Sequence, residues 1–176
     1  MTSEPAVATR MSEFASKETL REFLRQSAAP SYVLGQRTES PQEFFCIELQ
    51  RSSGEKSYVG VYSHGIGVRP GWRHADGRLF VGFNDRVAVL ALETLSLEQE
   101  IPLLSLFWEF IDVPQTSLIC VLCETAIVAL GADGLIAWRH DTGLITGSRV
   151  EDTVLRLDID SGSAICVDLR TGVKVA

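Results

Sequence analysis

The fold is decided by Leu118-Ile119-Cys120-Val121-Leu122, an apolar run that a short turn separates from Ile127-Val128-Ala129-Leu130. Two other stretches have the same plan: Leu79-Phe80-Val81-Gly82-Phe83 with Ala88-Val89-Leu90-Ala91-Leu92, and Val154-Leu155-Arg156-Leu157-Asp158 with Ala164-Ile165-Cys166-Val167-Asp168. The turn after each second strand aligns through Leu97, Gly134 and Gly172. The units recur at a period of about 37 residues, which is typical of stacked sheets that cannot bury their apolar faces alone.

The apolar pattern within the units predicts how the sheets stack. Residues 118–122 are apolar on both faces, so we expect them to be covered on both sides. In the third unit Leu155, Leu157 and Ile159 alternate with charged residues, so one face meets water or a partner. We therefore predict a mostly β fold, an open array of small antiparallel sheets made of three repeat units and an N-terminal hairpin (44–49 and 58–62). The last sheet would be completed by one strand of this hairpin or by a second copy of the chain.

The N-terminal segment differs from the rest in composition. We expect residues 1–10 to be disordered and 11–29 to form a helix, opened by Ser12 and Glu13 and stopped by Pro30. Residues 30–176 would form a single β-repeat domain, in which the glycine-rich segment 60–77 is the least strand-like part.

The composition is that of an ordinary soluble protein. The chain has 176 residues, of which 45% are hydrophobic and 22% charged, so one domain with a substantial core is expected. No apolar run approaches the roughly 18 to 20 residues of a membrane span, and the N-terminus has no secretory pattern. We interpret Cys46, Cys120, Cys123 and Cys166 as free thiols of a cytoplasmic protein. Cys120 and Cys123 should point to opposite faces of a strand, so they predict no metal site.

Acidic residues are concentrated in one half of the chain. Between Glu109 and Asp160 there are nine acidic residues and three basic ones, within a net charge of −7 for the whole chain. Such a surface would repel nucleic acid and attract a basic protein partner. A generic acidic surface that keeps the protein soluble explains the same excess.

Two stretches resemble the blade repeats of β-propellers of the pyrroloquinoline-quinone-dependent and related type. The matching residues are Val167, Asp168, Thr171 and Gly172 in the third unit, and Ala129, Leu130, Gly134 and Trp138 in the second. The resemblance covers residues 77–176 and implies a propeller-like fold. It implies no cofactor, because no unit supplies a recognisable cofactor site.

One loop could carry catalysis. Ser63, His64, His74 and Asp76 supply a nucleophile, bases and an orienting carboxylate, although no nucleophile elbow surrounds Ser63. The three histidines, His64, His74 and His140, could instead hold a metal with Asp76 or Asp141. We expect neither, because histidines beside turns are usually solvated or bonded to backbone. The stretch 158–162 looks like the start of a calcium loop, but the third acid and the distal glutamate are absent. We interpret it as a tight hairpin turn at residues 160–162.

Two tripeptides combine residue types that dominate binding hot spots, Trp72-Arg73-His74 and Trp138-Arg139-His140. They would bind a partner if both lay on one rim; otherwise each tryptophan packs at the end of a sheet.

These observations favour a non-catalytic protein-binding module, for instance an inhibitor or immunity-type protein for a basic partner. The residues expected to contact that partner are Glu151, Asp152, Asp158, Asp160, Trp72, Arg73, Trp138 and Arg139. Two alternatives are a small hydrolase or ligand-binding enzyme that uses the 63–76 loop, and a structural subunit that completes a partner's propeller. A homodimer is compatible with each of them.

Overall fold

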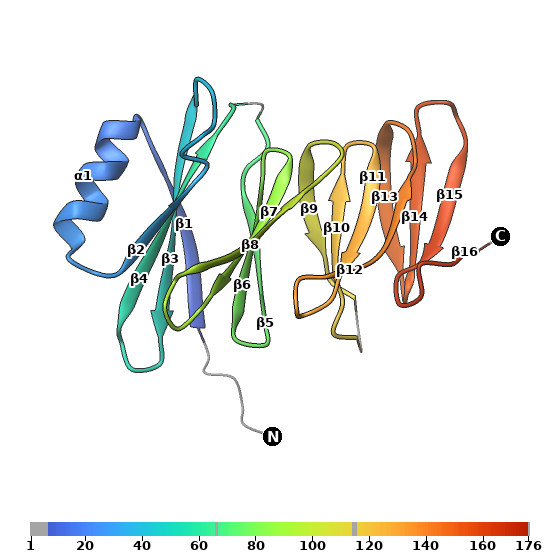
Figure 1. Ribbon diagram of the computed structural model, residues 1–176. Helices are drawn as coiled ribbons and strands as arrows, with labels where there is room; N and C mark the ends of the chain where they lie inside the picture. Colours follow the sequence, from blue (N-terminus) through green and yellow to red (C-terminus); the bar gives the residue numbers. More distant parts are fainter. Residues whose placement is uncertain (1–6, 66, 114–115, 176) are drawn as a thin grey trace.

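The computed structural model describes residues 7–65, 67–113 and 116–175, which form four four-stranded sheets stacked in a row and one helix (Figure 1). The first sheet, sheet A, has the order β1-β3-β4-β2. Its strands are β1 (Val7–Phe14), β2 (Ser31–Leu34), β3 (Glu43–Arg51) and β4 (Lys56–Ser63). Strand β2 runs parallel to β4, and the other pairs are antiparallel.

Sheets B, C and D are antiparallel meanders, each built from four consecutive strands. Sheet B contains β5 (Gly71–Ala75), β6 (Arg78–Phe83), β7 (Arg86–Ala91) and β8 (Leu97–Pro102). Sheet C contains β9 (Phe107–Ile111), β10 (Ile119–Cys123), β11 (Ala126–Leu130) and β12 (Ile136–Asp141). Sheet D contains β13 (Ile145–Glu151), β14 (Val154–Ile159), β15 (Ala164–Asp168) and β16 (Lys174–Val175). The predicted open array of small sheets is therefore confirmed.

The core is divided into layers between neighbouring sheets. Phe45, Val81 and Leu90 belong to the layer between sheets A and B, and Phe80 and Phe107 to the layer between B and C. A third layer, between C and D, includes Leu122, Leu155 and Leu157. Strand β10 is buried along its whole length because its two faces serve two different layers.

The outer face of sheet D is polar, as the alternation in the third unit predicts. Leu155, Leu157 and Ile159 are buried, whereas Arg156 and Asp158 between them are exposed. At the opposite end of the stack, helix α1 (Lys17–Ser27) lies on the outer face of sheet A and buries Leu20 and Leu24. Both ends of the row are thus closed by polar surface.

The N-terminal expectations need correction. Residues 7–14 were expected to be disordered or helical, but they form the edge strand β1, paired with β3 from Val7↔Arg51 to Phe14↔Phe44. The helix begins after Ser16, not at residue 11, because Ser16 and Thr19 form a capping box that satisfies free backbone groups of its first turn. Residues 1–6 lie outside the described residues.

Two expectations inside the β region are also wrong. The segment 60–77 contains the end of β4 and all of β5, so much of it is strand. The residue that takes the place of Gly172 in sheet B is Leu95, not Leu97. The N–H of Leu95 donates to the carbonyl of Ala91, just as the N–H of Gly172 donates to the carbonyl of Asp168. Both residues have a positive φ.

The hairpin strands 44–49 and 58–62 exist, but they do not complete the last sheet. They are parts of β3 and β4 in sheet A, at the far end of the stack from sheet D. Sheet D has four strands of its own, so the array stays open. Among the described residues, no helix has the length and apolar character that crossing a membrane requires.

Candidate functional site

The residues of the proposed catalytic loop are not brought together. Ser63 is buried at the end of β4, 3.4 Å from a carboxylate oxygen of Glu43, and His64 beside it is exposed. His74 lies on β5 with its Nε2 3.0 Å from Thr9 Oγ1. Thr9 and Ser57 both pair with Leu49 of β3, so His74 lies at the same level of the sheet as Ser57. Ser57 and Ser63 are at opposite ends of β4, roughly 20 Å apart at about 3.3 Å per residue, so His74 is far from Ser63. Asp76 is exposed in the turn after His74, at the same distant end.

Burial disfavours the thiolate form of three cysteines. Burial raises the pKa of Cys46, Cys120 and Cys123 to about 12, with a smaller contribution from Glu48 at Cys46. Cys120 packs into the layer between sheets C and D, and Cys123 into the layer between B and C. Their opposite orientation is the one expected for residues three apart on a strand. Within the described ranges, no three metal-ligating side chains gather in one place.

The two tryptophan tripeptides lie on opposite edges of the stack. Trp72 is on β5, the first strand of sheet B, and packs against the layer between sheets A and B. Arg73 next to it joins sheet B to sheet C, through Asp112 at 2.8 Å and the carbonyl oxygen of Phe110 at 3.0 Å. Trp138 is on β12, the last strand of sheet C.

Trp138 docks on the next sheet. A Cβ atom at Gly172 would lie 2.6 Å from two carbons of its indole ring, so only glycine permits this contact. The ring of His140 packs against Trp138 and bonds the carbonyl of Gly172. The turn itself is held by Asp168, whose carboxylate accepts bonds from the backbone N–H groups of Arg170 and Thr171. Trp138 is therefore a structural link between sheets, and Arg139 beside it pairs with Asp141.

The four acidic residues expected to bind a partner do not form one surface. On the outer face of sheet D, Glu151 pairs with Arg149 at 2.7 Å and Asp158 with Arg156 at 3.4 Å, so this face is nearly neutral. Asp152 lies in the turn between β13 and β14, and Asp160 follows β14 at the opposite end of the sheet. Only Asp160 belongs to the acidic surface described next.

A row of loops at one end of sheets C and D, the upper end in Figure 1, is joined by hydrogen bonds. Glu124, between β10 and β11, donates its N–H to the carbonyl of Leu106 and accepts from the N–H of Ile145. Asp160, between β14 and β15, donates its N–H to the carbonyl of Leu144. Loops from four connections thus form one continuous rim.

This rim combines acidic and apolar side chains. Leu104 and Leu144 are 61% and 41% exposed, on the connections β8–β9 and β12–β13. Asp141 is the last residue of β12, and Glu124 and Asp160 lie in the β10–β11 and β14–β15 turns. We call these five residues the acidic rim. The sequence analysis missed it because the loops of Leu104, Glu124 and Leu144 are brought together by strand pairing within sheet C and by the stacking of sheet D on it. Acids at the equivalent turns 124 and 160 were a readable signal.

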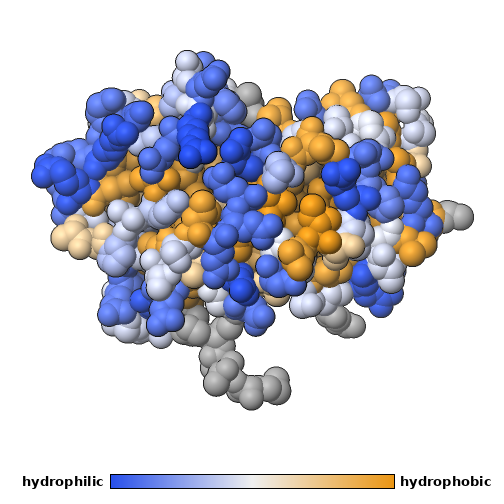
Figure 2. Space-filling model, in the orientation of Figure 1, coloured by the Kyte–Doolittle hydropathy of each residue, from blue (hydrophilic) through white to orange (hydrophobic). Residues whose placement is uncertain are grey.

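A second exposed apolar strip follows the outer strands β12 and β16. Its side chains are Leu135, Ile136, Val173 and Val175, between 37% and 62% exposed. Figure 2 shows apolar surface over this part of sheet C, bordered by hydrophilic residues. Trp138 of β12 contacts Gly172 in the turn that leads into β16.

No family model matches the chain, and no curated protein does. Among solved structures, dihydro-heme d1 dehydrogenase NirN in complex with DHE has a TM-score of 0.50 and 13% identity, over 76% of this chain and 34% of that chain. BamB from Moraxella catarrhalis has a TM-score of 0.49 and 15% identity, over 74% and 46%. The Neurospora crassa Pan2 WD40 domain has a TM-score of 0.47 and 9% identity, over 79% and 49%.

The similarity to NirN concerns the fold alone. At this level of identity it indicates a fold of propeller-like blades, and it does not single out the pyrroloquinoline-quinone type of repeat. The chain spans about a third of NirN and less than half of the other two proteins.

Proposed function

We propose that this protein is a non-catalytic protein-binding module that holds a basic partner against the acidic rim. The observation that carries the proposal is the grouping of two exposed leucines and three carboxylates on loops fixed by hydrogen bonds. Apolar side chains surrounded by charge are the usual anatomy of a transient interface.

The charge of the rim supports a basic partner. Its loops, 103–106, 124–125, 141–145 and 160–163, contain no lysine or arginine. Asp141 is the one rim acid with an ion pair among the described residues, to Arg139 at 3.7 Å. Glu124 and Asp160 are left to attract and orient a cationic surface, an effect that acts mainly on the association rate.

An inhibitor or immunity-type role in the cytoplasm is the concrete form of this proposal. A rigid stack of sheets can present the rim without rearranging, which lowers the cost of binding. The pyrroloquinoline-quinone type of repeat is likewise proposed for sheets C and D, on the Asp168 turn and the Trp138 contact.

The alternatives have less support. The distance between Ser63 and His74 disfavours a hydrolase that uses both. Completing a partner's propeller through the end faces would bury Arg156 and Asp158 of sheet D or displace helix α1 from sheet A. A homodimer could bury the second exposed apolar strip, Leu135, Ile136, Val173 and Val175, at its interface. Sedimentation of the purified protein would detect such a dimer.

The test compares two variants of equal net charge in affinity capture from the native extract. The rim variant carries Glu124→Lys and Asp160→Lys; the control carries Glu93→Lys and Glu109→Lys, at exposed sites outside the rim. We expect a basic protein that wild type and control retain at low salt, and that the rim variant loses. Association kinetics of that protein should slow with added salt for wild type and control. Equal capture by both variants, or no basic protein captured, would refute the proposal.

A further inference from the structure

A cleft of about 490 Å³ lies between the outer edges of sheets A and B, away from the acidic rim of sheets C and D. One wall is β2 with the loop that follows it, residues 32–39, and the other is formed by Arg86, Leu97 and Glu100 of sheet B. His64 also lines the cleft. The volume lies within the range of about 300–1,000 Å³ typical of ligand sites.

The walls of the cleft are held in place by a buried asparagine. Asn84 is 4% exposed, and its side-chain oxygen accepts from the N–H of His64 at 3.0 Å. Its amide nitrogen donates to Thr38 Oγ1 at 3.3 Å and to the carbonyl of Tyr62 at 3.4 Å. Gly35 is equally constrained, since a Cβ there would lie 2.5 Å from the Tyr62 oxygen. The cleft is therefore preformed.

The free edge of β2 opens into this cleft. Strand β2 pairs with β4 alone, and the N–H of Tyr58 on β4 bonds the carbonyl of Pro30. Because backbone groups alternate sides along a strand, those of Ser31 and Val33 point away from β4. The carbonyl of Val33 is indeed occupied from the open side, by the side-chain amide of Gln36 at 3.2 Å. The exposed side chain of Gln36 thus occupies the hydrogen-bonding position that the backbone of an adjacent strand would occupy.

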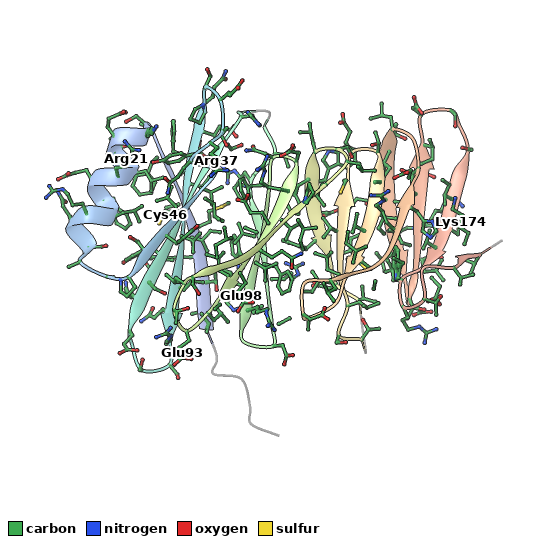
Figure 3. The ribbon with its side chains drawn as sticks, in the orientation of Figure 1. Arg21, Arg37, Cys46, Glu93, Glu98 and Lys174 are labelled. Atoms are coloured by element: carbon green, nitrogen blue, oxygen red, sulfur yellow. The ribbon has the colours of Figure 1, made fainter. Side chains whose placement is uncertain are left out.

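The charges of the cleft are of both signs. Arg86 is held by Asp85 at 2.9 Å and by Glu100 at 3.7 Å. Arg37 and Glu39, two residues apart on the loop after β2, form no ion pair with any other described residue. Figure 3 shows Arg37 at the upper end of the molecule, between sheets A and B. A ligand that complements both would carry one acidic and one basic group.

We propose that the cleft binds an extended peptide segment of a partner protein, which adds to β2 as a fifth strand of sheet A. The N–H and carbonyl of Val33 form main-chain hydrogen bonds with the peptide, which displaces the side chain of Gln36 from that carbonyl. Alternate side chains of the peptide lie over Leu97 and Tyr32. An acidic and a basic side chain two positions apart, on one face of the peptide, pair with Arg37 and Glu39. This proposal does not depend on the acidic rim.

The probes are two peptides, acetyl-Val-Glu-Val-Lys-Val-amide and its counterpart with glutamate and lysine exchanged. At about 1 mM, where a Kd of that size gives half occupancy, we expect one of them to shift the amide resonances of β2, Thr38 and His64. Exchange of the Val33 amide with solvent should slow by at least about tenfold, because it gains a partner. N-methylation of the central valine of the peptide should abolish both effects.

Two variants complete the test. Val33→Pro removes the outward N–H without touching the bonds of Tyr32 and Leu34 to β4, and should weaken binding at least about tenfold. Arg37→Glu with Glu39→Arg keeps the net charge and should invert the preference between the peptides. The proposal is overturned if neither peptide shifts these resonances, or if the N-methylated peptide binds equally well. Equal affinity of wild type for both peptides would overturn the charge pairing.

Discussion

Replacing Gly172 by alanine tests the contact that links sheets C and D. The residue has φ +71 and its new Cβ would lie 2.6 Å from carbons Cδ2 and Cγ of Trp138. The left-handed conformation costs a side chain about 1 kcal/mol, and forcing a methyl group against a packed ring costs about 1–3 kcal/mol more. The ring cannot retreat freely, because His140 packs against it and is bonded to the same turn. We expect a total of about 2–4 kcal/mol.

Gly162 provides the matched control. Its φ is +82 and a Cβ there would meet nothing within 4 Å, so Gly162→Ala should cost only the backbone component of about 1 kcal/mol. Urea unfolding followed by fluorescence and circular dichroism gives both values, and coincidence of the two probes shows whether the stack unfolds as one unit. In a Trp138→Ala background the extra cost of Gly172→Ala should vanish. Equal costs for the two alanines in the wild-type background would refute the docking argument.

Three further predictions concern the thiols, the helix and one buried carboxylate. At about pH 8 a thiol reagent should label Cys166 alone in the folded protein, and urea should release the three thiols of raised pKa, Cys46, Cys120 and Cys123, with the unfolding transition. Ser16→Ala should destabilise the protein by about 1 kcal/mol in urea unfolding, because it removes the capping box, whereas Ser53→Ala in an exposed turn should change little. Burial raises the pKa of Glu48, but hydrogen bonds from Lys56 and Arg10 outweigh it and hold the pKa below its usual 4.5. That stabilisation is present above pH 4.5 and is lost as the pH falls through the lower folded value, so Glu48→Gln should flatten the acid limb of stability between neutral pH and about pH 3.

The strands of the blades were predictable because the apolar pattern of each strand depends on its own residues alone. The run 118–122 is apolar on both faces, and the alternation of Leu157 with Asp158 marks an outer sheet; each reports its own environment directly. Strand β1 was not predictable in this way. Its residues 7–14 alternate weakly, and their pairing with β3 depends on partners that lie 30 to 44 positions further along the chain, from Phe14↔Phe44 to Val7↔Arg51.

The sites followed the same division. The sequence correctly located an excess of acid in the second half of the chain, since composition alone gives that. It could not show that Arg149 and Arg156 neutralise Glu151 and Asp158, or that the loop before β9 and the loop after β12 are both bonded to Glu124. These relations arise between strands and between sheets, where spacing along the chain carries no information.

The difference between the two ends of the stack limits how such a chain can grow. A duplicated blade inserted between sheets B and C would find apolar neighbours on both sides, and the row could lengthen. A blade appended beyond sheet D would contact a face that carries ion pairs between arginines and carboxylates. A blade placed before sheet A would contact helix α1. Tandem copies of the chain should therefore fold as independent domains instead of merging into a larger ring. A high concentration of the protein should not cause end-to-end association into filaments.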